Sequence, residues 1–142
     1  MSVVVNTNLV NALGYCAIGV AKVPLPWVVH LYVNYRVPQA SDPASAYTES
    51  TWPGYSPFSV TVADWVFLQE SPQIAYFSYP LITFTFDASA QAQQTVFGYF
   101  ITGTDGTLYL AELFPAPFPI PPDGGSLPLL LTWQSEQCPE TF

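Results

Sequence analysis

The stretch at residues 95–114 reads TVFGYFITGTDGTLYLAELF, and it decides the fold. Two runs rich in aromatic and β-branched residues flank a short polar segment, and such runs favour β-strands. Asp105-Gly106 between two apolar runs indicates a β-hairpin with a type I′ turn, although Gly103 indicates a slightly longer loop. Gly98, inside the first run, predicts a β-bulge or a close approach by another backbone.

Strand signals recur on both sides of this hairpin. Residues 58–62 and 81–86 alternate apolar with hydroxyl side chains, which is typical of strands with one buried and one wet face. Residues 28–34 are dominated by β-branched and aromatic residues, and residues 126–133 form a last apolar run. The turn at 52–55 carries Pro-Gly at its centre, as type II turns require.

About seven short strands separated by turn signals, without an amphipathic helix, predict an all-β chain. We expect an antiparallel β-sandwich or a partly open barrel with an extended N-terminal arm. The expected organisation is an apolar arm at 1–26, a single β domain at 27–133 and a polar tail at 134–142.

The composition is poor in charge. The chain has 142 residues, with 2 Lys and Arg against 10 Asp and Glu, and charged residues make up 8%, whereas soluble domains average about 25%. Other protein therefore covers much of the surface, in our interpretation. Two cations cannot form a phosphate-tracking patch, so nucleic acid is excluded as a partner, and so is an anionic membrane.

The apolar N-terminal stretch is interrupted by Pro24 and Pro26, so it does not predict a membrane span. Two cysteines, Cys16 and Cys138, lie near opposite ends. A disulfide would staple the termini, but two reduced thiols are favoured in a cytosolic product.

Four segments, in this order and spacing, resemble a family of small virion structural proteins encoded by tailed phages and prophages. They are residues 31–34 with Pro38, residues 47–55, residues 96–102, and residues 106–114 with Pro117. The resemblance implies a capsid decoration (cement) protein, with a tail, baseplate or spike component as the alternative. It also implies residence on the capsid surface of the virion after synthesis in the host cytoplasm. The implied partners are the major capsid protein and further copies of the chain.

Two segments are expected to contact neighbouring subunits, namely the N-terminal arm and the proline-rich segment at 115–122. Prolines keep such a segment extended before docking, so less conformational entropy is lost on binding. The candidate contact residues are Val3, Val4, Val5, Leu9, Val10, Leu13, Pro115, Pro117, Phe118, Pro119 and Ile120.

An aromatic platform for host glycans is the alternative site, with Trp52, Tyr55 and Trp65 as its candidates. The same residue types are also enriched in cores and subunit interfaces, so the platform competes with a packing role.

No catalytic constellation stands out, and we expect neither an enzyme nor a cofactor. His30 is the single histidine, and it lies on a strand without a Gly-x-Ser-x-Gly elbow or an evident acidic partner. One histidine and two distant cysteines also do not fit a zinc site. Glu49 and Glu112 lie in apolar segments, where they either face solvent or pair with Arg36 or Lys22.

Overall fold

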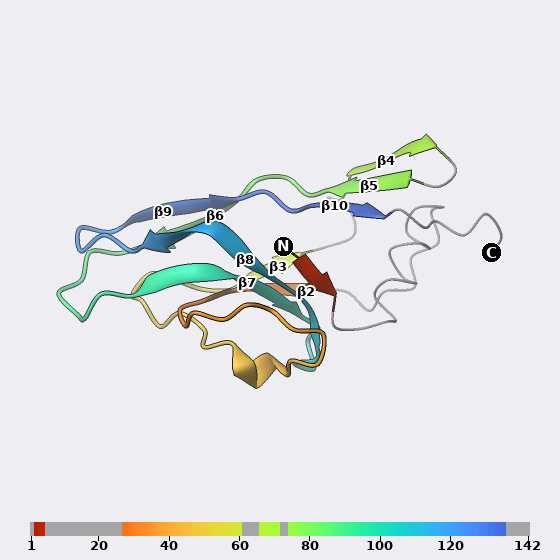
Figure 1. Ribbon diagram of the computed structural model, residues 1–142. Helices are drawn as coiled ribbons and strands as arrows, with labels where there is room; N and C mark the ends of the chain where they lie inside the picture. The colour runs from red at the N-terminus through yellow and green to blue at the C-terminus, as the bar shows by residue number, and fades with distance from the viewer. Residues whose placement is uncertain (1, 5–26, 61–65, 72–73, 136–142) are drawn as a thin grey trace.

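The computed structural model describes residues 2–4, 27–60, 66–71 and 74–135 (Figure 1). Within these residues the chain is all-β, with ten strands, one short 3₁₀ helix and antiparallel pairing throughout. The strands are β1 (Ser2–Val4), β2 (Trp27–Tyr32), β3 (Phe58–Val60), β4 (Val66–Ser71), β5 (Ile74–Ser78), β6 (Ile82–Phe86), β7 (Thr95–Thr102), β8 (Leu108–Pro119), β9 (Gly125–Leu129) and β10 (Thr132–Ser135). The 3₁₀ helix, η1, is Ala44–Ala46.

The hairpin β7–β8 forms the centre of a five-stranded sheet of order β1-β8-β7-β2-β3. Its loop contains a glycine at positive φ, Gly106 at 85°, whereas Asp105 does not have a positive φ. The Gly106 N–H donates to the Gly103 carbonyl at 3.1 Å, and the Gly103 N–H donates to the Thr107 carbonyl at 2.9 Å. A type I turn followed by a left-handed glycine has this pattern. The expected type I′ turn is therefore wrong, and the longer loop is confirmed.

A second layer, formed by β6 and β9, packs on one face of this sheet (Figure 1). On β6 the residues Ile82, Phe84 and Phe86 are buried, whereas Thr83 and Thr85 are exposed. The alternation expected from the sequence is therefore confirmed on β6, whose buried positions join the main core with residues of β2 and β7. On β3 it is not observed, since Phe58 and Ser59 are both exposed. The predicted sandwich is the observed architecture.

The opposite face of the five-stranded sheet is covered by the connection between β2 and β3, which includes η1 (Figure 1). A smaller core lies there, consisting of Tyr32, Tyr47, Phe100, Leu108 and Ala111. Tyr47 from the connection stacks on Phe100 of β7, with ring centroids 5.5 Å apart. Both faces of the central hairpin are thus buried, which explains its nearly continuous apolar sequence.

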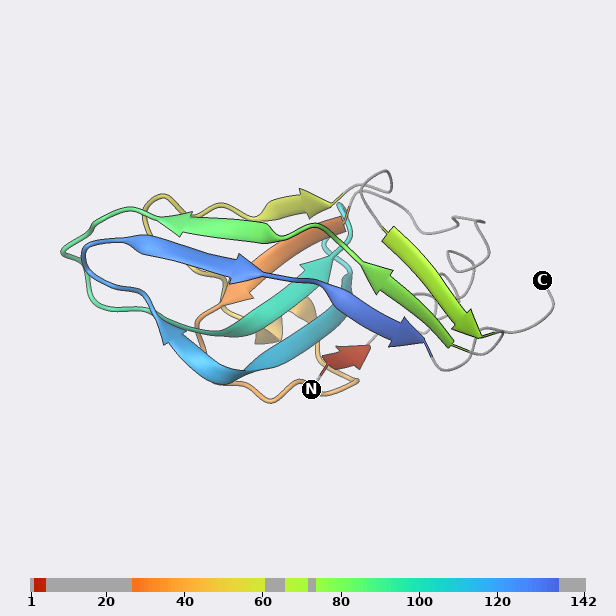
Figure 2. The ribbon, with the colours of Figure 1, turned by 90° about the horizontal axis from the view of Figure 1, so that it is seen from above.

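The strands β6 and β9 continue into β5 and β10 as one long ribbon, and β4 pairs with β5 at its far end (Figure 2). The register changes by one residue along this ribbon. Ile82 pairs with Leu129, but the Tyr79 N–H donates to the Leu131 carbonyl at 3.0 Å, so Pro80 and Leu81 oppose Leu130 alone. The sequence did not predict β5, a strand that begins two residues after the loop-forming Pro72.

Gly98 confirms both expectations made for it. The register between β7 and β8 shifts between Val96 and Gly98, which is a bulge. A Cβ on Gly98 would overlap the Glu112 carbonyl oxygen and lie 2.5 Å from the Tyr32 hydroxyl.

The proline-rich segment at 115–122 is extended as far as Pro119, as expected, but it also pairs within the sheet. β8 continues through Pro119, and Phe118 pairs with Val96. The prolines are tolerated because Phe97 alone opposes residues 114–117, so the first of them lie in a bulge of the ladder. At the other end of the chain, β10 includes Gln134 and Ser135, two residues that the sequence had placed in the tail.

Candidate interaction surfaces

The structure does not support the expected aromatic platform. Trp52 is 2% exposed in the core, where its indole N–H donates to the Asp87 carbonyl at 2.7 Å. Tyr55 is half-buried, and its ring stacks on Phe86 with centroids 6.3 Å apart. Trp65 lies outside the described residues. The prediction that Trp52 forms part of an exposed platform is therefore wrong, because the turn at 52–55 directs its side chain into the main core between the layers.

The N-terminal candidates divide into two groups. Val3 and Val4 lie on β1, which pairs with β8 of the same chain at Ala111 and Leu110. Their backbone therefore extends the chain's own sheet. The other four candidates lie outside the described residues, namely Val5, Leu9, Val10 and Leu13.

The proline-segment candidates also divide. Ile120 is fully buried in the main core, so its assignment as a contact is corrected. Phe118 is partly buried and stacks on Phe86, with centroids 6.0 Å apart. Pro115, Pro117 and Pro119 are exposed and remain available to a partner.

Exposed apolar side chains gather beside the bulge of β8. Tyr35 is 70% exposed and contacts the Phe97 ring edge-on at 5.8 Å, and Val37 is 50% exposed. The Tyr32 hydroxyl joins this loop to β8, because it lies 3.2 Å from the Arg36 carbonyl and 3.3 Å from the Glu112 carbonyl. We call this region the proline-bulge surface and define it as Tyr35, Val37, Phe97, Pro115 and Pro117.

A second exposed pair lies on the other layer, where the ribbon changes register. Leu81 is 62% exposed and Leu130 is 59% exposed. The bulge places them opposite each other on the outward side of the ribbon, and bulges commonly redirect side chains in this way. We call Leu81 and Leu130 the leucine pair.

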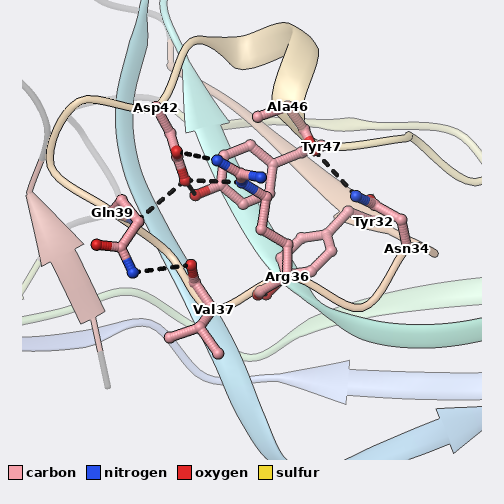
Figure 3. Close-up of polar contacts among 8 residues, drawn as sticks. All are labelled: Tyr32, Asn34, Arg36, Val37, Gln39, Asp42, Ala46 and Tyr47. Atoms are coloured by element: carbon pink, nitrogen blue, oxygen red, sulfur yellow. Dashed lines mark hydrogen bonds and ion pairs between the residues drawn. The ribbon is translucent and has the colours of Figure 1, made fainter.

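The one arginine of the chain is engaged within it. Arg36 forms a bidentate ion pair with Asp42, which is buried and also accepts from the Tyr47 hydroxyl at 2.7 Å and the Gln39 N–H at 3.0 Å (Figure 3). The Arg36 guanidinium, followed by the Tyr47 and Gln39 donors, holds the pKa of Asp42 well below its usual range. This network fixes the loop that carries Tyr35 and Val37.

His30 is part of a second polar network. Its Nδ1 lies 2.8 Å from the Glu49 carboxylate, and its Nε2 lies 2.9 Å from the Thr102 hydroxyl. The imidazole stacks on Phe100 at 4.7 Å, and the Tyr55 hydroxyl donates to Glu49 at 2.9 Å. The sequence predicted no acidic partner for His30, and this prediction is wrong. Its partner Glu49 lies 19 residues away in the chain, so the pairing is not evident from the sequence.

The order hydroxyl, imidazole, carboxylate matches that of a hydrolase triad. Thr102 is only 5% exposed, however, so its hydroxyl is not accessible to a substrate from solvent. The arrangement satisfies the buried Thr102 hydroxyl and the half-buried His30 ring, and it links β2, β7 and residue 49. Glu49 thus pairs with His30 and Tyr55, and Glu112 accepts from the Tyr99 hydroxyl at 2.7 Å.

Among the residues that the structure describes, no three His, Cys, Asp or Glu side chains gather as a metal site would require. In the same residues, no helix has the length and apolar character needed to cross a membrane. Comparison with known families and with curated proteins finds no match to this chain.

Proposed function

We propose that this protein is a virion structural protein that decorates and stabilises a tailed-phage capsid. In this proposal it binds major capsid subunits through the proline-bulge surface and meets further copies of itself on the capsid lattice. The observation that carries the proposal is the exposure of large apolar side chains, led by Tyr35 at 70%, on a chain with few charges.

Large contiguous apolar patches on a protein surface commonly mark contact sites with other proteins, membranes or ligands. Aromatic residues such as Tyr35 are enriched among the residues that dominate binding energies. The loop that carries Tyr35 is held by the Arg36–Asp42 pair and by the Tyr32 hydroxyl. A rigid surface of this kind loses little entropy on docking, and it has few charges to desolvate.

The experiment uses capsids stripped of the protein and then rebound with purified chain. Wild-type protein should rebind at on the order of hundreds of copies per particle, because the subunits of a capsid lattice repeat its binding site about that many times. Its rebinding should restore the resistance of the capsid to heat. A few dozen copies or fewer would instead favour the tail or baseplate, and no rebinding would sink the proposal.

Two double variants locate the contact. Tyr35→Ser/Val37→Ser should reduce the affinity for capsids by about tenfold or more, because each removes a large apolar contact. Leu81→Ser/Leu130→Ser is the matched control, since it removes two exposed apolar side chains from the opposite layer. If only the control variant fails to bind, the capsid contact lies on the ribbon and the proline-bulge surface is the wrong assignment.

A further inference from the structure

The outer edge of β8 has an unusual backbone chemistry at Pro117 and Pro119. The Ile120 N–H donates to the Gln94 carbonyl at 2.9 Å, and Phe118 pairs with Val96. Successive residues of a strand direct their backbone groups to opposite edges. The backbone N–H and C=O groups of Ile120 and Phe118 therefore point toward β7. The backbone carbonyls of Pro117 and Pro119 point away from it.

None of the described strands covers this part of the edge. β1 pairs with β8 only at residues 110–112, and Pro117 and Pro119 are exposed. Proline has no backbone N–H. This stretch therefore presents two outward carbonyl oxygens and no donor.

Such an edge does not accept a β-strand. Strand pairing needs donors and acceptors in alternation on both strands, and here every donor on one side is missing. The edge consequently rejects strand addition by a partner and by a second copy of the chain, which is a common protection of open sheet edges.

The same edge remains suited to side chains that only donate, and of these the guanidinium of arginine and the ammonium of lysine carry a positive charge. Charge favours the same partners. The chain has a formal net charge of −8, and its Arg36 is already paired with Asp42. A cationic partner is therefore complementary to this protein as a whole.

We propose that the outer edge of β8 at Pro117 and Pro119 docks arginine or lysine side chains of a partner and excludes partner strands. The inference rests on the proposed function, because it takes the capsid subunit as this partner. It adds the chemistry of the contact, namely donor side chains from a basic patch beside the proline-bulge surface.

The first experiment needs no partner. Pro117→Ala/Pro119→Ala restores two N–H donors to the edge, and Pro121→Ala/Pro122→Ala changes two exposed prolines in the turn beyond β8. Analytical ultracentrifugation should show the first variant at higher mass than wild type at equal protein concentration, whereas the second should match wild type. Equal masses for all three proteins, with folding verified by circular dichroism, would overturn the exclusion of strands.

The second experiment measures rebinding to stripped capsids. The affinity of wild-type protein should fall about tenfold or more between about 50 mM and about 500 mM NaCl, because salt screens the charge contacts. Capsids with arginines blocked by phenylglyoxal, or lysines blocked by acetylation, should bind less, and the two treatments tell the donor types apart. Binding that ignores salt and both treatments would overturn the donor contact, whereas no binding under any condition would count against the capsid function instead.

Discussion

Gly98 lies at the bulge of β7, where a side chain would overlap residues of both neighbouring strands. The Tyr32 ring and the Glu112 carbonyl occupy the space that a Cβ would need. Neither group can move away easily, because Tyr32 is fully buried and Glu112 belongs to the adjacent strand. The absence of a side chain at Gly98 therefore lets Tyr32 of β2 and the Glu112 carbonyl of β8 pack directly against β7.

We expect Gly98→Ala to destabilise the protein by roughly 2–4 kcal/mol, because the added methyl overpacks a buried contact. Gly106→Ala is the matched control. Its Cβ would meet nothing within 4 Å, so only the positive φ of 85° is penalised, at about 1 kcal/mol. Urea unfolding of both variants checks this order, and a larger loss for Gly106→Ala would contradict it.

Asp42 predicts a pH dependence of stability. Its folded pKa lies below its unfolded value, so its stabilisation is fully present above about pH 4 and is lost as pH falls through the folded pKa. Asp42→Asn should therefore cost about 2 kcal/mol at neutral pH, since it removes charge-assisted hydrogen bonds. The difference from wild type should shrink as the solution is made more acidic.

Chemical denaturation at pH 7 and at pH 3 measures this difference. The exposed Asp123 supplies the control, because Asp123→Asn removes the same charge from a turn. A difference between wild type and Asp42→Asn that stays constant over this range would contradict the assignment.

At the scale of elements, the His30 network joins segments that are far apart in the sequence. His30 lies on β2, Thr102 ends β7, and Glu49 forms an isolated bridge with Tyr32. The network therefore fixes the connection that covers the smaller core. Its members act together, so their contributions should not be additive.

We expect His30→Phe and Thr102→Val each to cost roughly 1–3 kcal/mol, because the first leaves the buried Thr102 hydroxyl and the second leaves the half-buried His30 ring without its hydrogen-bond partner. The double variant should cost less than the sum, with a coupling of about 1 kcal/mol. A double-mutant cycle by urea denaturation measures this coupling. Strict additivity would show that the hydrogen bond between His30 and Thr102 does not contribute.

The strand edges show how an element can be predicted in kind but not in detail. The sequence predicted that prolines at 115–122 keep the chain extended, and β8 does continue extended to Pro119. It did not predict that Phe118 would pair with Val96, because a bulge can absorb prolines only when the partner strand is known.

At the scale of the whole molecule, exposed apolar side chains lie on two opposite layers. The leucine pair contributes to one layer, and the proline-bulge surface contributes to the other. Leu81, Leu130, Tyr35 and Val37 are mostly exposed, whereas Phe97 packs against the smaller core. These four exposed side chains can therefore be altered without loss of the fold, which makes binding and stability separable.

We expect Leu81→Ser/Leu130→Ser to change the free energy of unfolding by no more than about 0.5 kcal/mol per site, because both side chains are mostly exposed. Its solubility should rise, since it removes an exposed apolar pair. Denaturation midpoints and precipitation with ammonium sulfate test the two statements. A large loss of stability would show that the leucine pair is covered within the folded chain.

The sequence by itself determined the all-β class, the central hairpin, the type II turn at Gly54 and the special role of Gly98. These features follow from local rules: side-chain alternation, β propensity and the few residues that can adopt a positive φ or leave room for a neighbour. The positive φ of 83° at Gly54 and the Tyr55 N–H bond to the Trp52 carbonyl agree with the turn.

Only the tertiary structure decided that Trp52 is buried, that His30 meets Glu49 and Thr102, and that Ile120 belongs to the core. Each of these outcomes depends on a partner distant in the sequence, and neither pattern nor propensity specifies which distant residues meet. The direction of the Pro117 and Pro119 carbonyls has the same origin, because only the pairing of Ile120 with Gln94 fixes which edge they face.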